Sequence, residues 1–226
     1  MTASPARLLG RPKDMEKRAA ILAAASQLIL ELGFERATVE RIAAAAGVSK
    51  LTVYSHFADK EGLFVALIGA KCDEHFEARE FVELAPLGPR EALTRIATAF
   101  LNLMFHADVI ALHRVLMTSA SAQTRMNELF WSAGPLPTLA ALARLLEHFD
   151  AEGVMQVSAP TRAADQFFSM LKGTEHLRVL LDVGAVPNPQ ALSELAHDTV
   201  TMYLRAYAPA QVQSSLTLSA APANGK

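Results

Sequence analysis

The sequence predicts an all-α protein with a small N-terminal domain and a larger helical body. Apolar residues recur three and four positions apart through most of the chain, and no stretch of any length alternates apolar and polar residues with the period of two that strands show. Clusters of Pro and Gly cut this pattern into segments of helical length. We expect a flexible basic arm at residues 1–13, a three-helix domain at 14–67, a body at 68–208 and a disordered tail at 209–226.

The N-terminal domain is predicted to contain two short helices joined by a tight turn. Thr38 directly precedes the first apolar periodic residues and is a good N-cap. Gly47 supplies the backbone freedom that a tight turn needs, and Ser49 offers a cap for a second helix over Lys50–His56. This order of cap, helix, glycine turn, cap and helix is typical of a helix-turn-helix.

The second of these helices is polar where a core helix would be apolar. Val53 and Phe57 lie four residues apart and are expected to face inward. The outer face is then formed by small or polar side chains: Lys50, Leu51, Thr52, Tyr54, Ser55 and His56. Lysine can donate to guanine or to a phosphate, threonine can contact a base edge, leucine offers apolar contact, and the remaining side chains suit phosphate oxygens. We therefore expect this face to read the major groove of double-stranded DNA.

The run GVSKLTVYSHFADKEGLF at residues 47–64 resembles the recognition helix and following turn of the tetracycline-repressor (TetR) family of bacterial regulators. Met15–Leu67 is similar to that family's whole DNA-binding domain, and the resemblance thins beyond it. It implies DNA contacts from the residues at the matching positions: Thr38, Ser49, Lys50, Thr52, Tyr54, His56 and Lys60. It also implies a ligand-responsive transcriptional regulator, a repressor rather than an activator, that binds a near-palindromic operator as a homodimer.

Several of these residues have structural alternatives. Thr38 can cap its helix with or without a phosphate contact, and Tyr54 and His56 can be ordinary surface residues. Lys60 follows Asp59, the expected N-cap of a fourth helix, and a lysine there opposes the helix dipole unless an anion lies nearby. A DNA phosphate would resolve that conflict.

Pro and Gly bound the helices of the body. The expected helices lie at residues 60–83, 90–106, 108–120, 123–150, 161–182 and 190–207. Gly134, Pro135 and Pro137 predict a kink or a break in the fourth of these. The helix at 60–83 joins the N-terminal domain to the body and is the expected coupling element between them.

The last two helices carry apolar stripes broad enough for burial on two sides. One side would pack on the body and the other on a second copy, giving a dimeric four-helix bundle; burial of both sides within one chain is the alternative. A helix-turn-helix that reads two half-sites about 34 to 36 Å apart needs two copies, which favours the dimer. The candidate interface residues are Phe168, Leu171, Leu192, Leu195, Thr199 and Tyr203.

The body is also the expected place for a hydrophobic or amphipathic inducer. Aromatic, Met and His side chains on successive helices can line an apolar cavity with a few polar groups, although core packing explains most of them equally well. The candidate lining residues are Met104, His113, Met117, Phe130, Trp131, Phe167, Met170 and His176.

Motifs and composition argue against other classes of protein. The chain has no catalytic motif, phosphate-binding loop or metal-ligand spacing, so we expect no enzyme activity, cofactor or metal. The single cysteine, Cys72, excludes an internal disulfide, with packing preferred over a redox role. No apolar run reaches the roughly 18 residues of a membrane span, and no signal peptide is evident, which predicts a cytoplasmic protein without a membrane partner. A purely structural bundle would leave the polar face of residues 50–56 without a purpose.

Charge is distributed unevenly along the chain. Residues 1–60 carry nine Lys or Arg against six Asp or Glu, net +3, and the other 166 carry twelve against seventeen, net −5. This asymmetry suits a DNA-binding head on an acidic body. Ahead of the first helix, a basic, turn-rich arm resembles the minor-groove arms of some TetR-family members, and a solvated tail is the alternative. The residues of this arm are Arg7, Gly10, Arg11, Pro12 and Lys13.

Overall fold

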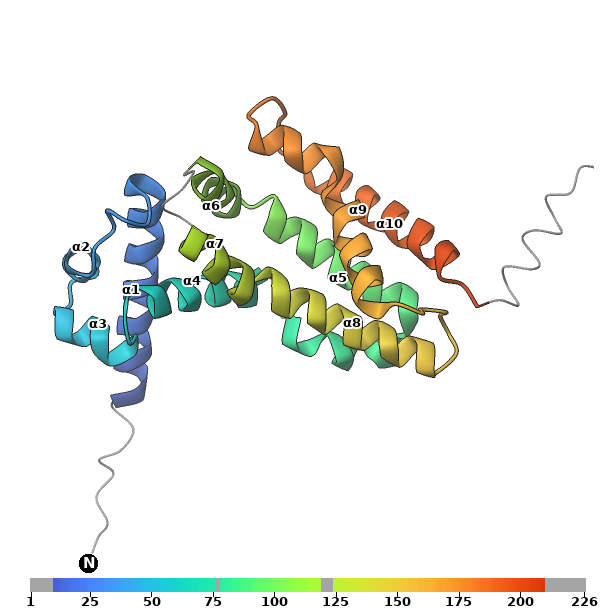
Figure 1. Cartoon of the computed structure of the whole chain (residues 1–226), viewed down its shortest axis with the longest axis horizontal. Coiled ribbons are helices and arrows are strands. Elements are labelled where there is room, and N and C mark those ends of the chain that lie inside the picture. Colours follow the sequence, from blue (N-terminus) through green and yellow to red (C-terminus); the bar gives the residue numbers. More distant parts are fainter. Residues whose placement is uncertain (1–9, 76–77, 119–123, 210–226) are drawn as a thin grey trace, which may run out of the picture. The chain divides into compact units, whose positions relative to one another are not determined.

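The structure is a computed structural model that describes residues 10–75, 78–118 and 124–209 (Figure 1). Within these residues every regular element is a helix, so the predicted all-α class is confirmed. The chain divides into two compact units. One comprises the residues up to Lys71 together with Ala111–Gly134, and the other comprises Cys72–Ile110 together with the residues from Pro135 onward. A segment that the sequence assigns to the body therefore packs as part of the N-terminal unit.

The N-terminal unit begins with α1 (Gly10–Leu32), α2 (Val39–Ala45) and α3 (Lys50–His56), drawn in blue in Figure 1. Because α1 starts at Gly10, the last four residues of the predicted flexible arm are helical instead. Residues 1–9 of that arm and residues 210–226 of the predicted tail lie outside the described residues.

A glycine turn ends α1 and directs the chain toward α2. Gly33 has φ +80°, and its amide donates to the Ile29 carbonyl at 2.9 Å. The Arg36 guanidinium then donates to the Leu32 carbonyl at 2.8 Å, so two of the last carbonyls of α1 are satisfied.

Apolar residues at helical spacing form the core of the N-terminal unit. Its buried side chains include Ile21, Ala25, Ile29, Ile42, Ala43, Val53, Phe57, Leu63, Phe64 and Leu67. The Phe34 ring meets Phe64 edge-on with centroids 5.2 Å apart. Since Phe64 lies in α4 (Lys60–His75), this contact fixes the start of α4 against the helix-turn-helix.

The remaining helices follow in the predicted order with shifted ends. They are η1 (Ala78–Leu87), α5 (Gly88–Met104), α6 (Ala107–Thr118), α7 (Thr124–Ala133), α8 (Pro135–Ala151), α9 (Pro160–Leu180) and α10 (Pro189–Ala206). The break predicted at Gly134 and Pro135 is confirmed, because α7 ends and α8 begins there.

The predicted helix at 60–83 is wrong in its C-terminal part. α4 ends at His75, and the chain then forms η1, a 3-10 helix. Pro86 lies within η1 and has no amide hydrogen for an α-helical bond to the residue four earlier. Phe81 and Ala85 are nevertheless buried, so this segment still contributes apolar surface to the core of its unit.

The core of the second unit is built from apolar stripes on η1, α5, α8, α9 and α10. In this unit α10 packs on α5, and α8 packs on both α9 and η1. Phe167 on α9 and Tyr203 on α10 are both buried, with ring centroids 4.9 Å apart. Gly173 interrupts α9 with φ 50° and ψ −160°, a conformation that only glycine adopts readily, so α9 is kinked at that residue.

One helical stretch of the described chain, Thr124–Ala151, is long and apolar enough to cross a membrane by length and composition. It consists of α7 and α8. Two further helical stretches, Phe81–Met104 and Ala107–Met117, are bent relative to each other and meet the same criteria only if they are taken together as one span. Core helices of water-soluble proteins meet the same criteria, so this is weak evidence for a membrane protein.

Candidate nucleic-acid interface

Side-chain caps fix both helices of the helix-turn-helix. The Thr38 hydroxyl accepts from the Arg41 amide at 3.4 Å and caps α2. The Ser49 hydroxyl accepts from the Thr52 amide at 3.0 Å and caps α3. Between them, Gly47 takes φ +65°. The helix-turn-helix predicted from these caps and this glycine is confirmed.

Four of the six residues predicted for the outer face of α3 are exposed, and Thr52 and His56 are partly buried. Val53 and Phe57 are buried, whereas Leu51 is 79% exposed and Tyr54 is 44% exposed. An aliphatic side chain so exposed does not contribute to the core of its own chain. On a helix of this kind it is available for a thymine methyl group.

Two hydroxyls on α3 are already hydrogen-bonded inside the helix. Ser55 donates to the Thr52 carbonyl at 2.7 Å. The Thr52 hydroxyl lies 2.8 Å from the Ser49 hydroxyl, and either oxygen can be the donor. The Ser55 proton is therefore engaged in the free chain, and Ser55 must turn its hydroxyl away from this carbonyl before it can donate to a phosphate.

His56 faces α1 rather than the open face of α3. Its side chain is only 9% exposed, and its Nε2 lies 3.3 Å from the Asp14 carboxylate. The adjacent Phe57 ring carries the Arg18 guanidinium 5.2 Å from its centroid. His56 is thus positioned to hold α3 against α1.

The Lys60 ammonium makes its contacts within the chain. Its Nζ donates to the Glu35 carbonyl at 3.1 Å and lies 4.2 Å from the centroid of the Phe34 ring. Partial burial lowers the pKa of this ammonium. The Lys60 ammonium thus contacts a neutral carbonyl and an aromatic ring. Asp59 caps α4 by accepting from the Gly62 amide at 2.7 Å.

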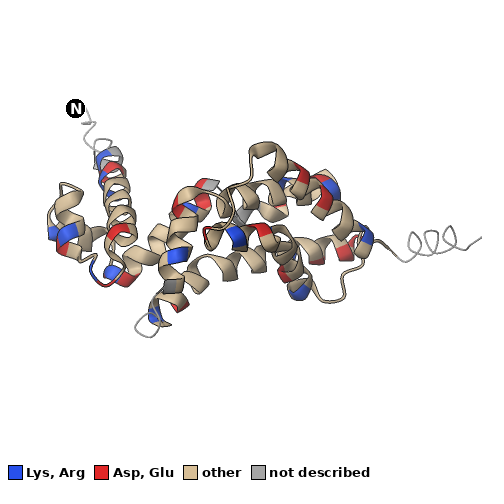
Figure 2. Cartoon of the chain, turned by 90° about the horizontal axis from the view of Figure 1, so that it is seen from above, with Lys and Arg blue, Asp and Glu red and all other residues tan. Residues whose placement is uncertain are grey.

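Lys50, the first residue of α3, forms an ion pair with Glu40 in the first turn of α2. The Lys50 ammonium also lies 5.7 Å from the centroid of the Tyr54 ring. Basic and acidic residues are interspersed along the described helices (Figure 2). The exposed face of α3 therefore carries a lysine whose charge is balanced by a neighbouring carboxylate.

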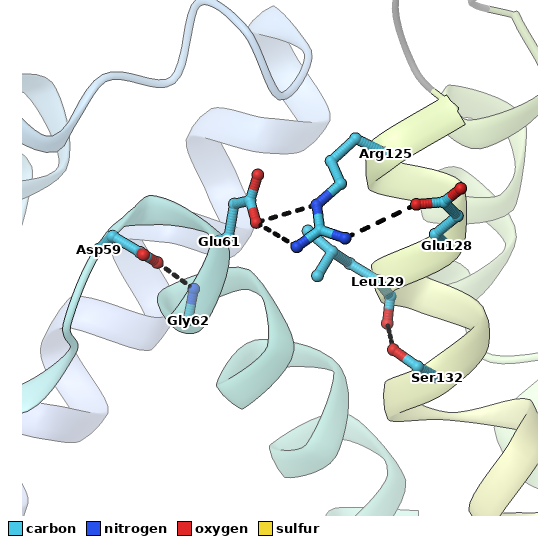
Figure 3. Close-up of polar contacts among 7 residues, drawn as sticks. All are labelled: Asp59, Glu61, Gly62, Arg125, Glu128, Leu129 and Ser132. Atoms are coloured by element: carbon cyan, nitrogen blue, oxygen red, sulfur yellow. Dashed lines mark hydrogen bonds and ion pairs between the residues drawn. The ribbon is translucent and has the colours of Figure 1, made fainter.

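An ion pair also joins α4 to α7 within the N-terminal unit (Figure 3). The Arg125 guanidinium donates twice to one oxygen of Glu61, at 3.0 Å from Nε and 2.8 Å from Nη2. Arg125 also lies 3.6 Å from the Glu128 carboxylate. Glu61 lies two residues after Asp59, so this contact connects the start of α4 to a helix 64 residues further along the chain.

The candidate pocket residues fall into two groups that belong to different units. His113, Met117, Phe130 and Trp131 belong to the N-terminal unit, and Met104, Phe167, Met170 and His176 belong to the second. Met117 and Trp131 are exposed, whereas Phe167 is fully buried in the core of its unit. His113 packs edge-on against Phe130 with centroids 5.5 Å apart.

His176 is buried on α9, and its ring meets Phe105 edge-on at 5.7 Å. Burial, together with the positive charge of Lys172, lowers the pKa of this imidazole. The folded chain therefore favours the neutral form.

Below the ordinary His pKa of 6.5, the unfolded chain binds a proton that the folded chain resists, so the free energy of unfolding is expected to fall as the pH drops from 6.5 to the lowered pKa. Urea unfolding at about pH 7.5 and about pH 5.5 measures this loss. In His176→Gln the free energy of unfolding should fall less than in the wild type. In the control His197→Gln, which alters an exposed histidine, it should fall as much as in the wild type. An equal loss in wild type and His176→Gln would refute the assignment.

Most of the candidate dimer residues are buried in the core of the chain. Phe168, Leu171, Leu192, Thr199 and Tyr203 are all buried, and Leu195 is partly buried against the core. The apolar surface that α9 and α10 leave open includes Met170, Leu177 and Met202 instead.

A groove of about 560 Å³ lies between α9 and α10. Its lining residues are Gln166, Ser169, Met170, Met202, Tyr203, Ala206 and Tyr207. The Tyr207 hydroxyl donates to Gln166 at 2.6 Å, whereas the buried Tyr203 hydroxyl has no hydrogen-bond partner among the described residues. Burial raises the pKa of Tyr203, so its phenol stays neutral.

Cys72 and the acidic residues show no reactive arrangement. Burial, with a smaller contribution from Asp73, raises the pKa of the Cys72 thiol to about 11. The thiolate is the reactive form, so this environment favours packing over redox chemistry. Among the described residues, no cluster of three or more His, Cys, Asp or Glu could hold a metal ion.

Sequence reasoning missed the residues whose partners are distant in sequence. Glu40, Asp14, Glu61 and Arg125 each make a polar contact that depends on how two helices cross. Local spacing carries no signal for such contacts.

A helix-turn-helix followed by further helices is an arrangement found in DNA-binding transcriptional regulators. Residues 21–67 match the family described as bacterial regulatory proteins, tetR family. Residues 91–209 match the AefR-like transcriptional repressor C-terminal domain. The chain belongs to the TetR family, which confirms the resemblance found in its sequence.

Known relatives agree with this assignment. The solved structure of the flavonoid-responsive regulator FrrA is 32% identical and has a TM-score of 0.69, with 86% of this chain and 98% of FrrA covered. The transcriptional repressor BepR of Brucella suis is 46% identical over 54 residues, 24% of this chain and 26% of BepR. The transcriptional regulator EthR of Mycolicibacterium smegmatis is 34% identical over 95 residues, 41% of this chain and 43% of EthR. The chain thus matches less than half the length of these two curated relatives.

Proposed function

We propose that this TetR-family regulator is a cytoplasmic repressor that binds a near-palindromic operator as a homodimer and releases it when its body binds a small hydrophobic or amphipathic molecule. The observation that carries the proposal is the exposed face of α3, where Leu51 and Tyr54 are open while Val53 and Phe57 are buried. The repressor BepR is similar to the DNA-binding part of this chain, which supports repression.

The side chains of α3 have distinct roles in this proposal. Lys50, Leu51 and Thr52 lie at the start of the helix, the end that enters the major groove in helix-turn-helix proteins, and contact base edges. The Tyr54 hydroxyl contacts a phosphate. Five further residues orient the helices in the free chain: Thr38, Ser49, Ser55, His56 and Lys60. To contact a phosphate, each of these side chains would have to share or exchange the polar contact that it makes now.

Dimerisation is assigned to the open apolar surface of α9 and α10. Met170 and Met202 are exposed and line the groove between these helices. A second copy would cover the groove and bury these two methionines. Two recognition helices held by such a dimer could read two half-sites of one operator.

Ligand response requires a molecule that prefers one arrangement of the body over another, because a ligand without that preference shifts no equilibrium. FrrA, the similar regulator, is described as flavonoid-responsive, which supports an apolar inducer for this chain as well. Trp131, the only tryptophan in the sequence, is 52% exposed on α7 and provides a fluorescence signal for screening such molecules.

The ion pair between Arg125 and Glu61 is the contact through which α7 would influence α4. Arg125→Gln is expected to speed amide hydrogen exchange a few-fold in the first turns of α4 and in α7, because it removes both bonds to Glu61. Exchange in α3 should not change. Hydrogen-exchange mass spectrometry measures both regions in one experiment.

The matched control is Arg95→Gln, which removes an exposed arginine bonded to Glu91 within α5. This variant should leave α4 and α7 unchanged. If Arg125→Gln also left them unchanged, the ion pair would not hold α4 and α7 together, and the coupling role assigned to it would be wrong.

Fluorescence anisotropy with DNA upstream of the protein's own gene and a scrambled duplex, at two salt concentrations, tests the proposed function. Tight binding to the upstream duplex alone, with log affinity falling by about 0.9 for each phosphate contacted per log unit of salt, would support it. Salt-dependent binding to both duplexes alike would place the operator elsewhere. Absence of binding to either duplex, or to any duplex enriched from a random pool, would refute it.

A further inference from the structure

Lys50 is the only Lys or Arg in the recognition helix α3, and it is tied to a carboxylate on the neighbouring helix. Its Nζ pairs with Oε1 of Glu40, ten residues earlier, and both side chains are at least half exposed. The Lys50 ammonium, the backbone amide of Glu40 and the Thr38 hydroxyl lower the pKa of the Glu40 carboxyl to about 2. Glu40 is therefore charged throughout the neutral range.

Breaking this ion pair costs free energy when the helix-turn-helix binds DNA. A lysine that turns to a phosphate must leave Glu40, and the unpaired carboxylate then faces the negatively charged backbone. Phosphate contacts supply essentially all of the affinity for non-specific DNA, so this cost falls most heavily on non-specific binding. In the major groove, guanine offers Lys50 two acceptors, O6 and N7, which can replace the bond to Glu40.

We propose that Glu40 is a specificity-determining residue that holds Lys50 away from phosphates, so that Lys50 is released mainly to a guanine edge in the correct site. Specificity then arises from a penalty on incorrect DNA as well as from an attraction to the operator. This inference rests on the proposed DNA-binding function and adds to it a residue outside the recognition helix.

Glu40→Gln tests the inference, because glutamine keeps the length and the hydrogen-bonding oxygen of glutamate and removes its charge. Two probes are used with the full-length protein: a duplex enriched by the wild type from a random pool, and a scrambled duplex of the same composition. Affinity for the scrambled duplex is expected to rise several-fold, and its salt dependence should steepen by about 0.9 for each protomer bound, the signature of one added phosphate contact. Affinity for the enriched duplex should rise less, so the ratio of the two affinities should fall.

The double variant Glu40→Gln with Lys50→Gln isolates the role of Lys50. If Glu40 acts by restraining Lys50, Glu40→Gln should not change binding to the scrambled duplex when Lys50 is already replaced. If Glu40→Gln raised the affinity for the scrambled duplex equally in the Lys50→Gln background, the Glu40 carboxylate would repel DNA directly. The proposal that Glu40 acts by restraining Lys50 would then be refuted.

Glu31→Gln, on α1, is the control for net charge, because Glu31 is exposed and accepts only from Gln27 on its own helix in the contacts described. An equal gain from Glu31→Gln would also overturn the inference. If the wild type enriched no duplex from the random pool, the proposed DNA-binding function itself would be refuted. If the wild type enriched a duplex but Glu40→Gln left the ratio of the two affinities unchanged, only the role of Glu40 would be refuted. Circular dichroism of each variant checks that it is folded.

Discussion

Replacing Tyr54 with alanine is expected to weaken binding to every DNA duplex, operator and scrambled alike. Tyr54 is 44% exposed on the outer face of α3, and its hydroxyl has the length to reach a phosphate beside the groove. A hydrogen bond to a charged group contributes roughly 1.5–3 kcal/mol, so the loss should be at least about tenfold for each protomer. Because a dimer carries two copies, operator affinity should fall by about a hundredfold or more.

Fluorescence anisotropy at several salt concentrations measures this loss together with the number of phosphate contacts. The salt dependence should become shallower by about 0.9 for each protomer if one phosphate contact is lost. Tyr54→Phe keeps the ring near the Lys50 ammonium, 5.7 Å from it, and removes only the hydroxyl. It should bind as weakly as Tyr54→Ala if the hydroxyl is what contacts DNA.

Thr52→Ala provides the contrasting result. Thr52 is expected to contact a base edge, so its loss should change the preferred base at one or two positions while leaving the salt dependence unchanged. Unaltered affinity and salt dependence in Tyr54→Ala would mean that the outer face of α3 does not read DNA.

The local part of the site could be predicted from sequence because it depends on contacts three or four residues apart. Thr38 and Ser49 accept from amides three residues later, and Gly47 takes the positive φ that the turn requires. The inward positions of Val53 and Phe57 follow from the helical repeat alone. Propensity and periodicity contain all the information that these features need.

The non-local part could not be predicted, because it depends on how helices cross. His56 was expected to face phosphates, but the packing of α3 on α1 brings it to Asp14. The carbonyl of Glu35 reaches Lys60 only because the turn after α1 lies beside the start of α4. Such contacts change with a rotation of a helix that leaves its amphipathic pattern intact.

Apolar periodicity also cannot distinguish burial within a chain from burial against a second copy, because the same hydrophobic effect drives both. The stripes on α9 and α10 predicted two-sided burial. The residues chosen from them, such as Leu171 and Tyr203, lie in the core of the monomer, and the neighbouring Met170 and Met202 remain exposed. The structure therefore shifts the candidate interface to the adjacent faces of the same two helices.

The double variant Met170→Glu with Met202→Glu is expected to abolish dimerisation and, with it, tight operator binding. Met170 is 37% exposed and Met202 is 53% exposed, so both charges are solvated in the monomer and the fold should be retained. In the proposed dimer these carboxylates would be buried without partners, at a cost of several kcal/mol. Sedimentation velocity should then show a monomer where the wild type is a dimer.

Operator affinity should fall by at least about a hundredfold in this variant, because a monomer binds one half-site without the advantage of linkage to a second. Met117→Glu, which adds the same charge to an exposed methionine on α6, should leave both the dimer and the affinity unchanged. A dimer that survived the double substitution would place the interface elsewhere on the chain. Loss of the dimer with full operator affinity would instead show that a single protomer makes the complete DNA contact, since the substituted residues lie on helices remote in sequence from α3.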